Sequence, residues 1–373
     1  MSFTSANNLT PPHLNLPRRQ ELPEGAHYGN LPRLWVRTQA GPAIGFGHLR
    51  RSLTLASLLQ GEVSPLFLIS PGDVWTAESA TERGWDSARF DRPTLSGRNK
   101  PHCVLIDTRE VSGLLEFIQE MREQGIPVVS IHDLGLNPLP SDIAIDGSIA
   151  PEFEGFPRSG TCFVGGLKYL VLDPAFEELH RRQKSPSPEV RRVVVNLGGG
   201  DSSEYFHKVL ESFRRCGRPI EVIGVPGFTS WGQQNLAEMH WKPVRFRWAE
   251  TGESIADLLG QADLAVTAGG LSAFETLCAG VPLAALAYDS HQQKTIETIA
   301  RRGACVNLGP GGNLDPGRAA LVFALMQRDL HLRAALSQRG KRLVDGGGAR
   351  RVCGIIRRHW TGAPAARAEC KVS

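Results

Sequence analysis

The sequence predicts an α/β protein built from two Rossmann-like domains, each with a doubly wound parallel sheet. Apolar runs of strand length alternate with helical patterns, and the runs are apolar throughout rather than at every second position. Such strands are typical of parallel sheets covered by helices on both faces. The alternation stops once near the middle of the chain and then restarts. A length of 373 residues suits two cores of ordinary size.

The first half contains five candidate strands with helices between them. The strands are expected at residues 34–38, 66–70, 104–107, 128–133 and 143–146. The clearest helices are expected at 49–59 and 111–124. Residues 1–32 are rich in Pro, Asn and Ser and lack periodicity, so they are expected to form a disordered tail. The first domain is therefore predicted at 33–180.

A linker and a second domain follow. Residues 181–192 combine prolines, serines and basic residues, which predicts a linker. The strand and helix alternation then continues through a domain at 193–345, and residues 346–373 are expected to form a C-terminal helix and tail. The predicted strands of this half lie at 193–197, 220–225, 244–248, 264–268, 283–288 and 305–308.

Composition limits the classes of function. There are 42 Lys and Arg against 38 Asp and Glu, and a formal charge of +4 is too small and too scattered to predict nucleic-acid binding. The seven cysteines form no CxxC pair, so neither a disulfide framework nor a zinc site is expected. We expect a cytoplasmic protein with no signal peptide and no integral membrane segment. The sequence does not indicate an oligomeric state.

Three glycine loops stand where a predicted strand ends and a helix begins. There the backbone N–H groups can approach an anion, and the helix N-terminus adds partial positive charge. A diphosphate is the natural ligand for such a loop, although glycine is also common at these turns for packing alone. None of the loops matches the GxGxxG or Walker A pattern. The loops span residues 44–48, 196–201 and 267–272.

Two longer segments carry a family resemblance. Residues 44–56, IGFGHLRRSLTLA, resemble the opening motif of the UDP-sugar hydrolases of pseudaminic acid synthesis and of their relatives in spore-coat polysaccharide biosynthesis. Residues 262–282, ADLAVTAGGLSAFETLCAGVP, look like the nucleotide-binding segment of the same family, and are also similar to the peptidoglycan N-acetylglucosaminyl transferase. The resemblance implies the GT-B fold, in which two Rossmann-like domains enclose a cleft.

The resemblance also implies roles for individual residues. His48 matches the histidine proposed as the catalytic base, and Glu275 matches the acid that binds the ribose hydroxyls. The pair His291 and Gln292 matches the sugar-contacting pair, with His291 where the family usually has Asn. The loop facing the diphosphate corresponds to Gly269, Gly270, Leu271 and Ser272.

Other candidates come from position rather than from a matched role. Asp107 ends a predicted strand and is a candidate catalytic residue, although Asp is also an ordinary helix cap there. The pair His132 and Asp133 ends the next strand and is a weaker candidate. Substrate-binding candidates from the glycine loops and their neighbouring cations are Arg37, Gly45, Gly47, Arg50 and Gly199.

Two positions depart from the family pattern. An Arg-x-Asp sequence is expected at the first strand, but here it is Arg37, Thr38 and Gln39. An Asp-x-Tyr sequence is expected after the third strand, but Arg109 replaces the aromatic residue. Both positions are expected on the acceptor or sugar side of the site.

Three functions remain open on these grounds. The favoured one is a UDP-sugar hydrolase that releases UDP and free sugar, in bacterial surface-glycan or nonulosonic acid biosynthesis. A GT-B glycosyltransferase would use the same donor with another acceptor, and a weakened sugar-nucleotide-binding protein would explain Gln39 and Arg109. We expect no cofactor and no metal, since no acidic pair suggests one; helix dipoles and backbone N–H groups would stabilise the departing UDP.

Overall fold

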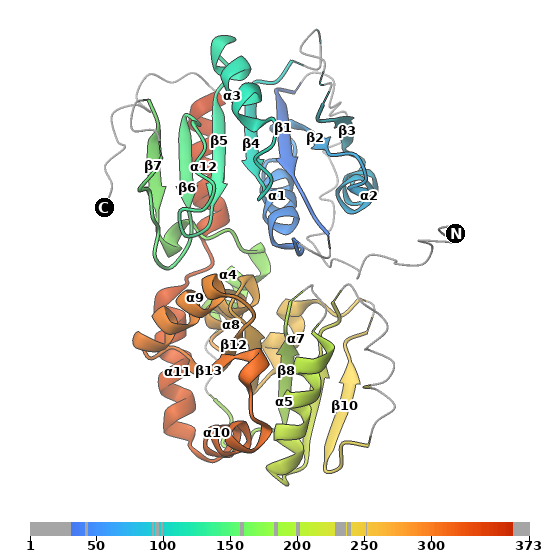
Figure 1. The fold of residues 1–373 in the computed structure, drawn as a ribbon, viewed down its shortest axis with the longest axis vertical. Coiled ribbons are helices and arrows are strands. Elements are labelled where there is room, and N and C mark those ends of the chain that lie inside the picture. The colour runs from blue at the N-terminus through green and yellow to red at the C-terminus, as the bar shows by residue number, and fades with distance from the viewer. Residues whose placement is uncertain are drawn as a thin grey trace, which may run out of the picture. The chain divides into compact units, whose positions relative to one another are not determined.

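The computed structural model describes residues 31–360 except 42–43, 92, 94–96, 98–99, 157–159, 183–185, 199–201, 228–235, 237–239 and 251. The chain forms two compact units, each built on one parallel sheet (Figure 1). The first unit contains the described residues up to Pro174 and those from Gly346 onward, and the second contains Ala175–Asp345. The predicted pair of parallel-sheet domains is therefore confirmed.

The sheet of the first unit has seven strands in the order β3-β2-β1-β4-β5-β6-β7, and every pairing is parallel. All five predicted strands are present. The two others, β3 and β7, were not predicted because they are short and not fully buried. The strands are β1 Arg33–Thr38, β2 Ser64–Ile69, β3 Asp86–Arg89, β4 Cys103–Asp107, β5 Val128–His132, β6 Ile143–Asp146 and β7 Cys162–Gly165; the helices are α1 Gly47–Leu58, α2 Val74–Glu82, α3 Leu114–Glu123, the short η3 Leu167–Tyr169 and α12 Gly348–Trp360.

The sheet of the second unit has six parallel strands in the order β10-β9-β8-β11-β12-β13. All six were predicted. The strands are β8 Arg192–Asn196, β9 Ile220–Gly224, β10 Val244–Trp248, β11 Leu264–Ala268, β12 Leu283–Ala287 and β13 Val306–Pro310; the helices are α4 Pro174–Arg181, α5 Ser203–Arg215, α7 Ile255–Gln261, α8 Leu271–Ala279, α9 Ser290–Arg301, the short η4 Gly311–Asn313, α10 Pro316–Arg328 and α11 Leu330–Leu343.

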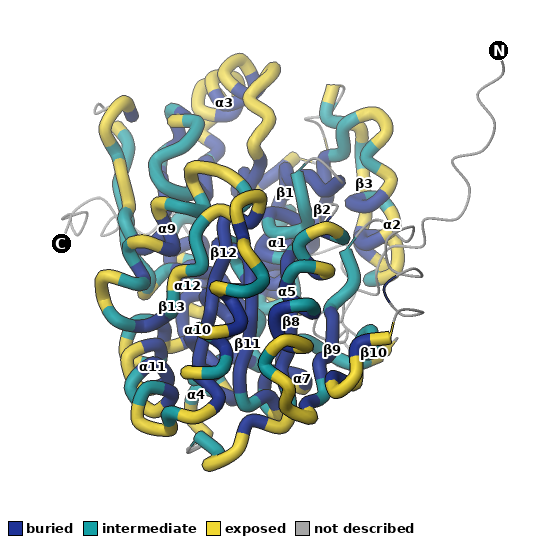
Figure 2. Tube along the Cα trace, turned by 60° about the horizontal axis from the view of Figure 1, so that its bottom comes forward, coloured by how far each residue is buried: buried dark blue, intermediate teal, exposed yellow. Residues whose placement is uncertain are grey.

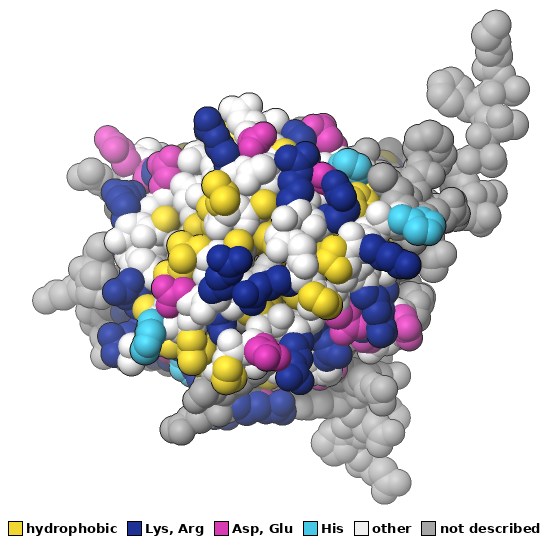
Figure 3. Space-filling model, turned by 90° about the horizontal axis from the view of Figure 1, so that it is seen from below, with side chains coloured by type: hydrophobic (Ala, Val, Ile, Leu, Met, Phe, Trp, Pro, Cys, Tyr) yellow, Lys and Arg dark blue, Asp and Glu magenta, His cyan; other side chains and the backbone are white. Residues whose placement is uncertain are grey.

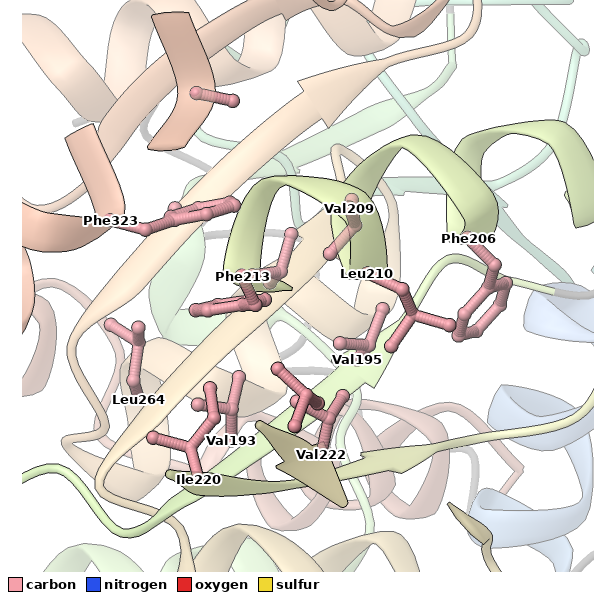
Figure 4. Packing of buried hydrophobic residues seen from close by; sticks show 14 of the residues in the cluster. Val193, Val195, Phe206, Val209, Leu210, Phe213, Ile220, Val222, Leu264 and Phe323 are labelled. Carbon is pink, nitrogen blue, oxygen red and sulfur yellow. The ribbon is translucent and has the colours of Figure 1, made fainter. Parts of the chain in front are cut away.

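Helix α5 covers one face of the second sheet, and its apolar side chains belong to a hydrophobic core that also includes residues of α10 and of the strands. Phe213 of α5 stacks on Phe323 of α10 with ring centroids 4.2 Å apart, and both rings are fully buried. Below them lie valines of the central strands, among them Val193 and Val222 (Figure 4). Figure 2 shows the same strands as buried along their length. Burial on both faces explains why these strands are apolar at consecutive positions.

Helix α12, at the C-terminal end of the described chain, packs in the first unit against α1 and η3. Val352 and Ile356 of this helix are fully buried. At its first residue, the Cα of Gly348 lies so close to the backbone of Leu170 that a Cβ would come within 2.0 Å of the Leu170 carbonyl oxygen. The first unit is thus completed by a segment remote in sequence.

The cysteines, the helix lengths and the surface charges concern the expectations about disulfides, membrane segments and nucleic-acid binding. Cys103, Cys216, Cys278, Cys305 and Cys353 carry free thiols. No helix within the described residues is long and apolar enough to span a bilayer. On the face drawn in Figure 3, Lys and Arg side chains stand among acidic, apolar and uncharged ones.

The packing of α12 predicts opposite effects for two glycine substitutions in one helix. Gly348→Ala should destabilise the first unit by ~1–3 kcal/mol or more, because the new methyl group would clash with backbone atoms, which cannot rotate away as a side chain can. Gly354→Ala should be neutral or stabilise by up to about 1 kcal/mol, because nothing lies within 4 Å and alanine favours the helix. Scanning calorimetry measures both. A similar shift for the two variants would contradict this account of the packing.

Candidate functional site

Each sheet has a point where the strand order reverses. In the first unit the chain builds β1, β2 and β3 in one direction and β4 to β7 in the other, so β1 and β4 are neighbours. In the second unit β8 and β11 are the corresponding pair. Doubly wound sheets bind ligands outside the carboxyl ends of such strands. The three predicted glycine loops follow β1, β8 and β11, so all three lie at these points.

His48 and Asp107 meet at the reversal point of the first sheet. The chain turns after β1 through Gly45, whose φ of +81° favours glycine, and α1 begins at Gly47. His48 is therefore the second residue of the helix, and its side chain is buried. Its Nδ1 lies 2.6 Å from Oδ1 of Asp107, the last residue of β4. The structure thus brings together the two predicted catalytic residues.

Arg51 joins this pair, although its role was not predicted. It lies one helical turn after His48 and donates from Nε to Oδ2 of Asp107 at 2.8 Å and from Nη2 to Oδ1 at 2.7 Å. Its Nη1 donates to both oxygens of Asp133, at 2.8 and 2.9 Å. The spacing of three residues on a helix was the available signal, because it places Arg51 beside His48.

The charges of this cluster determine the protonation of its members. Burial alone would raise the pKa of Asp107, but the charge of Arg51, followed by His48, outweighs it and lowers the pKa. Burial opposes the charge on Arg51 as well, yet Asp107 and Asp133 raise its pKa. An ionised carboxylate only accepts hydrogen bonds, so its 2.6 Å contact with His48 favours the tautomer with the proton on Nδ1. Nη2 of Arg51 also lies 2.9 Å from Nδ1, and a hydrogen bond donated from there would favour the other tautomer. With the proton on Nδ1, Nε2 is the ring nitrogen that can accept a proton.

Arg37 is directed into the interior of the first unit. Its guanidinium donates to Glu110 at 2.9 Å, to Ser70 Oγ at 2.5 Å and to the carbonyl of Leu68 at 3.1 Å. It also lies 4.4 Å from the centre of the Phe90 ring. Burial lowers the pKa of Arg37, and the charge of Glu110 partly restores it. These contacts account for Arg37 without a ligand.

The two departures from the family pattern lie near this network. Gln39 donates its side-chain N–H to Glu110 and accepts from the Thr108 hydroxyl at 2.5 Å. The Arg109 carbonyl accepts from Asn137 at 3.0 Å. Gln39 therefore acts as a structural bridge between the segments that follow β1 and β4.

His132 and Asp133 have different environments. His132 Nε2 lies 2.6 Å from the Ser130 hydroxyl and Nδ1 lies 3.1 Å from the Leu136 carbonyl oxygen. Burial lowers the pKa of His132, which favours a neutral ring held by its neighbours. Asp133 instead binds Arg51, with its side chain 37% exposed.

The second unit offers a helix N-terminus suited to an anion. Helix α8 follows Gly269 and Gly270 and has neither a side-chain cap nor an acidic residue in its first turn. Helix α1 of the first unit has the same properties. Helices α3 and α5 also lack a side-chain cap, but each has a Glu in its first turn. Five other described helices have their first turns capped by Asp or Ser side chains. The capping residues are Asp73, Ser254, Asp289, Asp315 and Asp329.

The neighbours of this N-terminus include most of the predicted nucleotide-binding residues. A Cβ at Gly269 would lie 2.7 Å from the backbone oxygen of Gln292, so glycine lets α9 approach the loop. The space around Gly270 is open. Leu271 begins α8, and the Ser272 hydroxyl lies 3.5 Å from the carbonyl of Asn196 in β8. Glu275 is completely buried on the same helix.

The remaining candidates are placed less favourably or lie outside the description. The Gln292 side chain accepts from the Tyr288 backbone at 3.1 Å. The backbone N–H of Gln292 donates to the Asp289 side chain at 2.8 Å, which caps helix α9. His291 is exposed and Arg50 is partly buried. Gly199 lies outside the described residues. Among the residues that are described, no three His, Cys, Asp or Glu side chains are grouped to hold a metal ion.

Sequence comparison gives one informative relative. The spore coat polysaccharide biosynthesis protein SpsG of Bacillus subtilis is 30% identical over 203 residues, which are 54% of this chain. The chain spans only 60% of the length of that relative. No family model matches the chain.

Structure comparison identifies the fold. MurG of Acinetobacter baumannii superimposes with a TM-score of 0.63 at 14% identity, covering 88% of this chain and 99% of MurG. LpCGTa, whose structure was determined in complex with UDP, gives 0.59 at 13% identity, covering 89% of this chain and all of LpCGTa. The chain has the GT-B fold and is similar to SpsG over 203 residues. At these identities the structural matches show the fold alone.

The buried ion pair predicts that Asp107→Asn destabilises the first unit. The change leaves Arg51 buried with one carboxylate fewer, which typically costs about 3–5 kcal/mol. Because the pKa of Asp107 is lowered in the folded state, its stabilisation is present above the unfolded pKa and is lost as pH falls through the folded pKa. The difference between wild type and variant should therefore shrink on acidification.

Unfolding followed by calorimetry between neutral and acidic pH measures this difference. Asp86→Asn serves as the control, because Asp86, which pairs with Arg33, has an exposed side chain. Loss of this ion pair should lower the stability by less than about 1 kcal/mol. An Asp107 variant as stable as the Asp86 variant at neutral pH would disprove the structural role of the buried pair.

Proposed function

We propose that the protein is a metal-independent UDP-sugar hydrolase that releases UDP and free sugar, acting in bacterial surface-glycan or nonulosonic acid biosynthesis. The single observation that carries the proposal is the contact of His48 with Asp107 at the reversal point of the first sheet. The likeness to SpsG, whose name refers to polysaccharide biosynthesis, supports the pathway class.

The His48 and Asp107 pair is suited to general base catalysis. Asp107 accepts from Nδ1, which leaves Nε2 to take a proton from water as the water oxygen attacks the anomeric carbon. The bond between that carbon and the diphosphate oxygen breaks, and UDP leaves with the electron pair. The buried carboxylate stabilises the imidazolium that forms, as in other histidine and carboxylate pairs.

The departing UDP is assigned to the α8 N-terminus of the second unit. Backbone N–H groups without a side-chain cap, together with the helix dipole, can bind the diphosphate without a metal. Glu275 is assigned to the ribose hydroxyls, and His291 and Gln292 to the sugar. Of this pair, Gln292 accepts the Tyr288 backbone N–H at its side-chain Oε1, so a sugar contact by this oxygen would need rearrangement.

Glycosyl transfer is the alternative, because the same base could activate an acceptor hydroxyl. The fold supports it equally, since MurG has this fold. Incubation with a panel of UDP-sugars, with and without polyol or glycan acceptors, separates the two reactions. UDP release without an acceptor supports hydrolysis, whereas release that depends strictly on an acceptor supports transfer.

His48→Ala is expected to lower kcat by ~10²–10⁴ while UDP affinity stays nearly unchanged. The base acts on the attacking water, so its contribution arises in the transition state. Continuous assay of UDP release and calorimetric titration with UDP measure the two quantities. His291→Ala is the comparison, since this exposed residue should affect KM rather than kcat. Near-normal kcat in His48→Ala would show that another group is the base.

Gly270→Asp should separate stability from binding at the proposed diphosphate site. The new side chain can cap α8, which typically stabilises a helix by up to about 1 kcal/mol, but its charge would occupy the position of the phosphates. We expect a higher melting temperature and loss of the stabilisation by UDP.

Gly270→Asn is the matched control, because it caps the helix without adding charge and should retain more UDP binding. GDP should stabilise the wild type less than UDP does. Full UDP stabilisation of Gly270→Asp would exclude the α8 N-terminus as the diphosphate site.

A further inference from the structure

Three charged groups at the reversal point of the first sheet, Arg51, Asp107 and Asp133, connect three elements of the first unit. Arg51 on α1 holds Asp107 at the end of β4 through two nitrogens and holds Asp133 after β5 through the third. Asp107 has no exposed surface, and the Arg51 side chain is only 7% exposed. The guanidinium therefore fixes the plane of the Asp107 carboxylate, because two donors bind its two oxygens.

That plane decides which ring nitrogen of His48 carries the proton. Oδ1 of Asp107 receives both Arg51 Nη2, at 2.7 Å, and His48 Nδ1, at 2.6 Å. The same Nη2 lies 2.9 Å from Nδ1, so Nδ1 keeps its proton only while Asp107 holds Nη2 as an acceptor. A carboxylate free to rotate, or one that became protonated by burial, would no longer require a proton on Nδ1. The form with basic Nε2 would then lose its preference. Arg51 thus has a means of acting on His48 without touching the substrate.

Asp133 supplies the other half of the arrangement. With neutral His48, the cluster contains one positive and two negative charges, from Arg51, Asp107 and Asp133. When His48 takes a proton, the cluster becomes electrically balanced. Without Asp133, Arg51 alone would neutralise Asp107, and the proton would add an uncompensated positive charge. The negative charge of Asp133 therefore compensates the positive charge that His48 gains when it takes a proton during catalysis.

We propose that Arg51 and Asp133 are positioning residues of the site: Arg51 holds Asp107 so that His48 keeps its basic Nε2, and Asp133 offsets the charge of Arg51 when His48 is protonated. This inference rests on the proposed role of His48 as the base. The alternative hypothesis is a purely structural role, in which Arg51 only stabilises the packing of α1 against the sheet.

The test compares Arg51→Lys and Asp133→Asn with Arg357→Lys in the full chain. Arg357 also makes a two-pronged ion pair in the first unit, with Glu62 beyond the C-terminal end of α1, whereas His48 lies at the N-terminal end of that helix. Lysine cannot reproduce the fork of Arg51. Nitrogen-15 NMR of the His48 ring reports the tautomer in the free protein, and kcat, KM and unfolding are measured on the same samples.

We expect wild type and Arg357→Lys to show one tautomer with the proton on Nδ1, and Arg51→Lys to show a mixture. Arg51→Lys should lower kcat by roughly 10²-fold with UDP affinity kept. Asp133→Asn should keep the tautomer and lower kcat by about tenfold, a smaller effect because Asp133 is partly exposed.

The outcomes separate the hypotheses. If Arg51→Lys is merely less stable and keeps both the tautomer and kcat, the structural role alone is correct and the proposal fails. If Arg51→Lys does not fold, an Asp133→Asn variant with wild-type kcat is sufficient to overturn it. If the wild type releases no UDP from any UDP-sugar, the proposed function fails, while the tautomer measurement still decides whether Arg51 controls the His48 ring.

Discussion

The buried ion pair between Arg51 and Asp107 is the interaction on which the first unit's site depends. A guanidinium and a carboxylate that are removed from water must pair with each other and form further hydrogen bonds, because an unpaired buried charge is strongly destabilising. Here those partners are His48 and Asp133, so the requirement to satisfy a buried charge also places a histidine at the carboxyl edge of the sheet. Catalytic geometry and stability are therefore coupled in one cluster.

The parallel sheets make this cluster possible. Thr38 at the end of β1 is in register with Asp107 at the end of β4, so the helix that follows β1 starts beside the last residue of β4. In the second unit, Thr267 of β11 is in register with Asn196 of β8, which places two glycine loops next to each other. In both sheets the reversal of strand order leaves the space above these strand ends available for a ligand.

Helices α1 and α8 differ at their N-termini from the capped helices of this chain. Where Asp or Ser binds the first-turn N–H groups, as at α9 and α10, the partial positive charge is already satisfied within the protein. Helices α1 and α8 lack such caps and acidic first turns. A helix without a cap is less stable because its first-turn N–H groups lack acceptors, and a bound anion can accept hydrogen bonds from them and stabilise the helix. This contrast supports a phosphate-binding role for α8 more specifically than the presence of glycines alone does.

The sequence by itself determined the two parallel sheets, the positions of all their strands except β3 and β7, and the placing of the glycine loops, because continuous apolar runs and glycines at strand ends are local signals. It also pointed to His48 and Asp107 separately. Only the tertiary structure decided that these residues touch, that Arg51 and Asp133 join them, and that Arg37 binds Glu110 and the Leu68 carbonyl. Strands β3 and β7 and the return of α12 to the first unit were equally undetermined. The reason is physical: hydrophobic periodicity reports burial along a segment, whereas the partners of a buried charge depend on side chains brought together from distant parts of the chain.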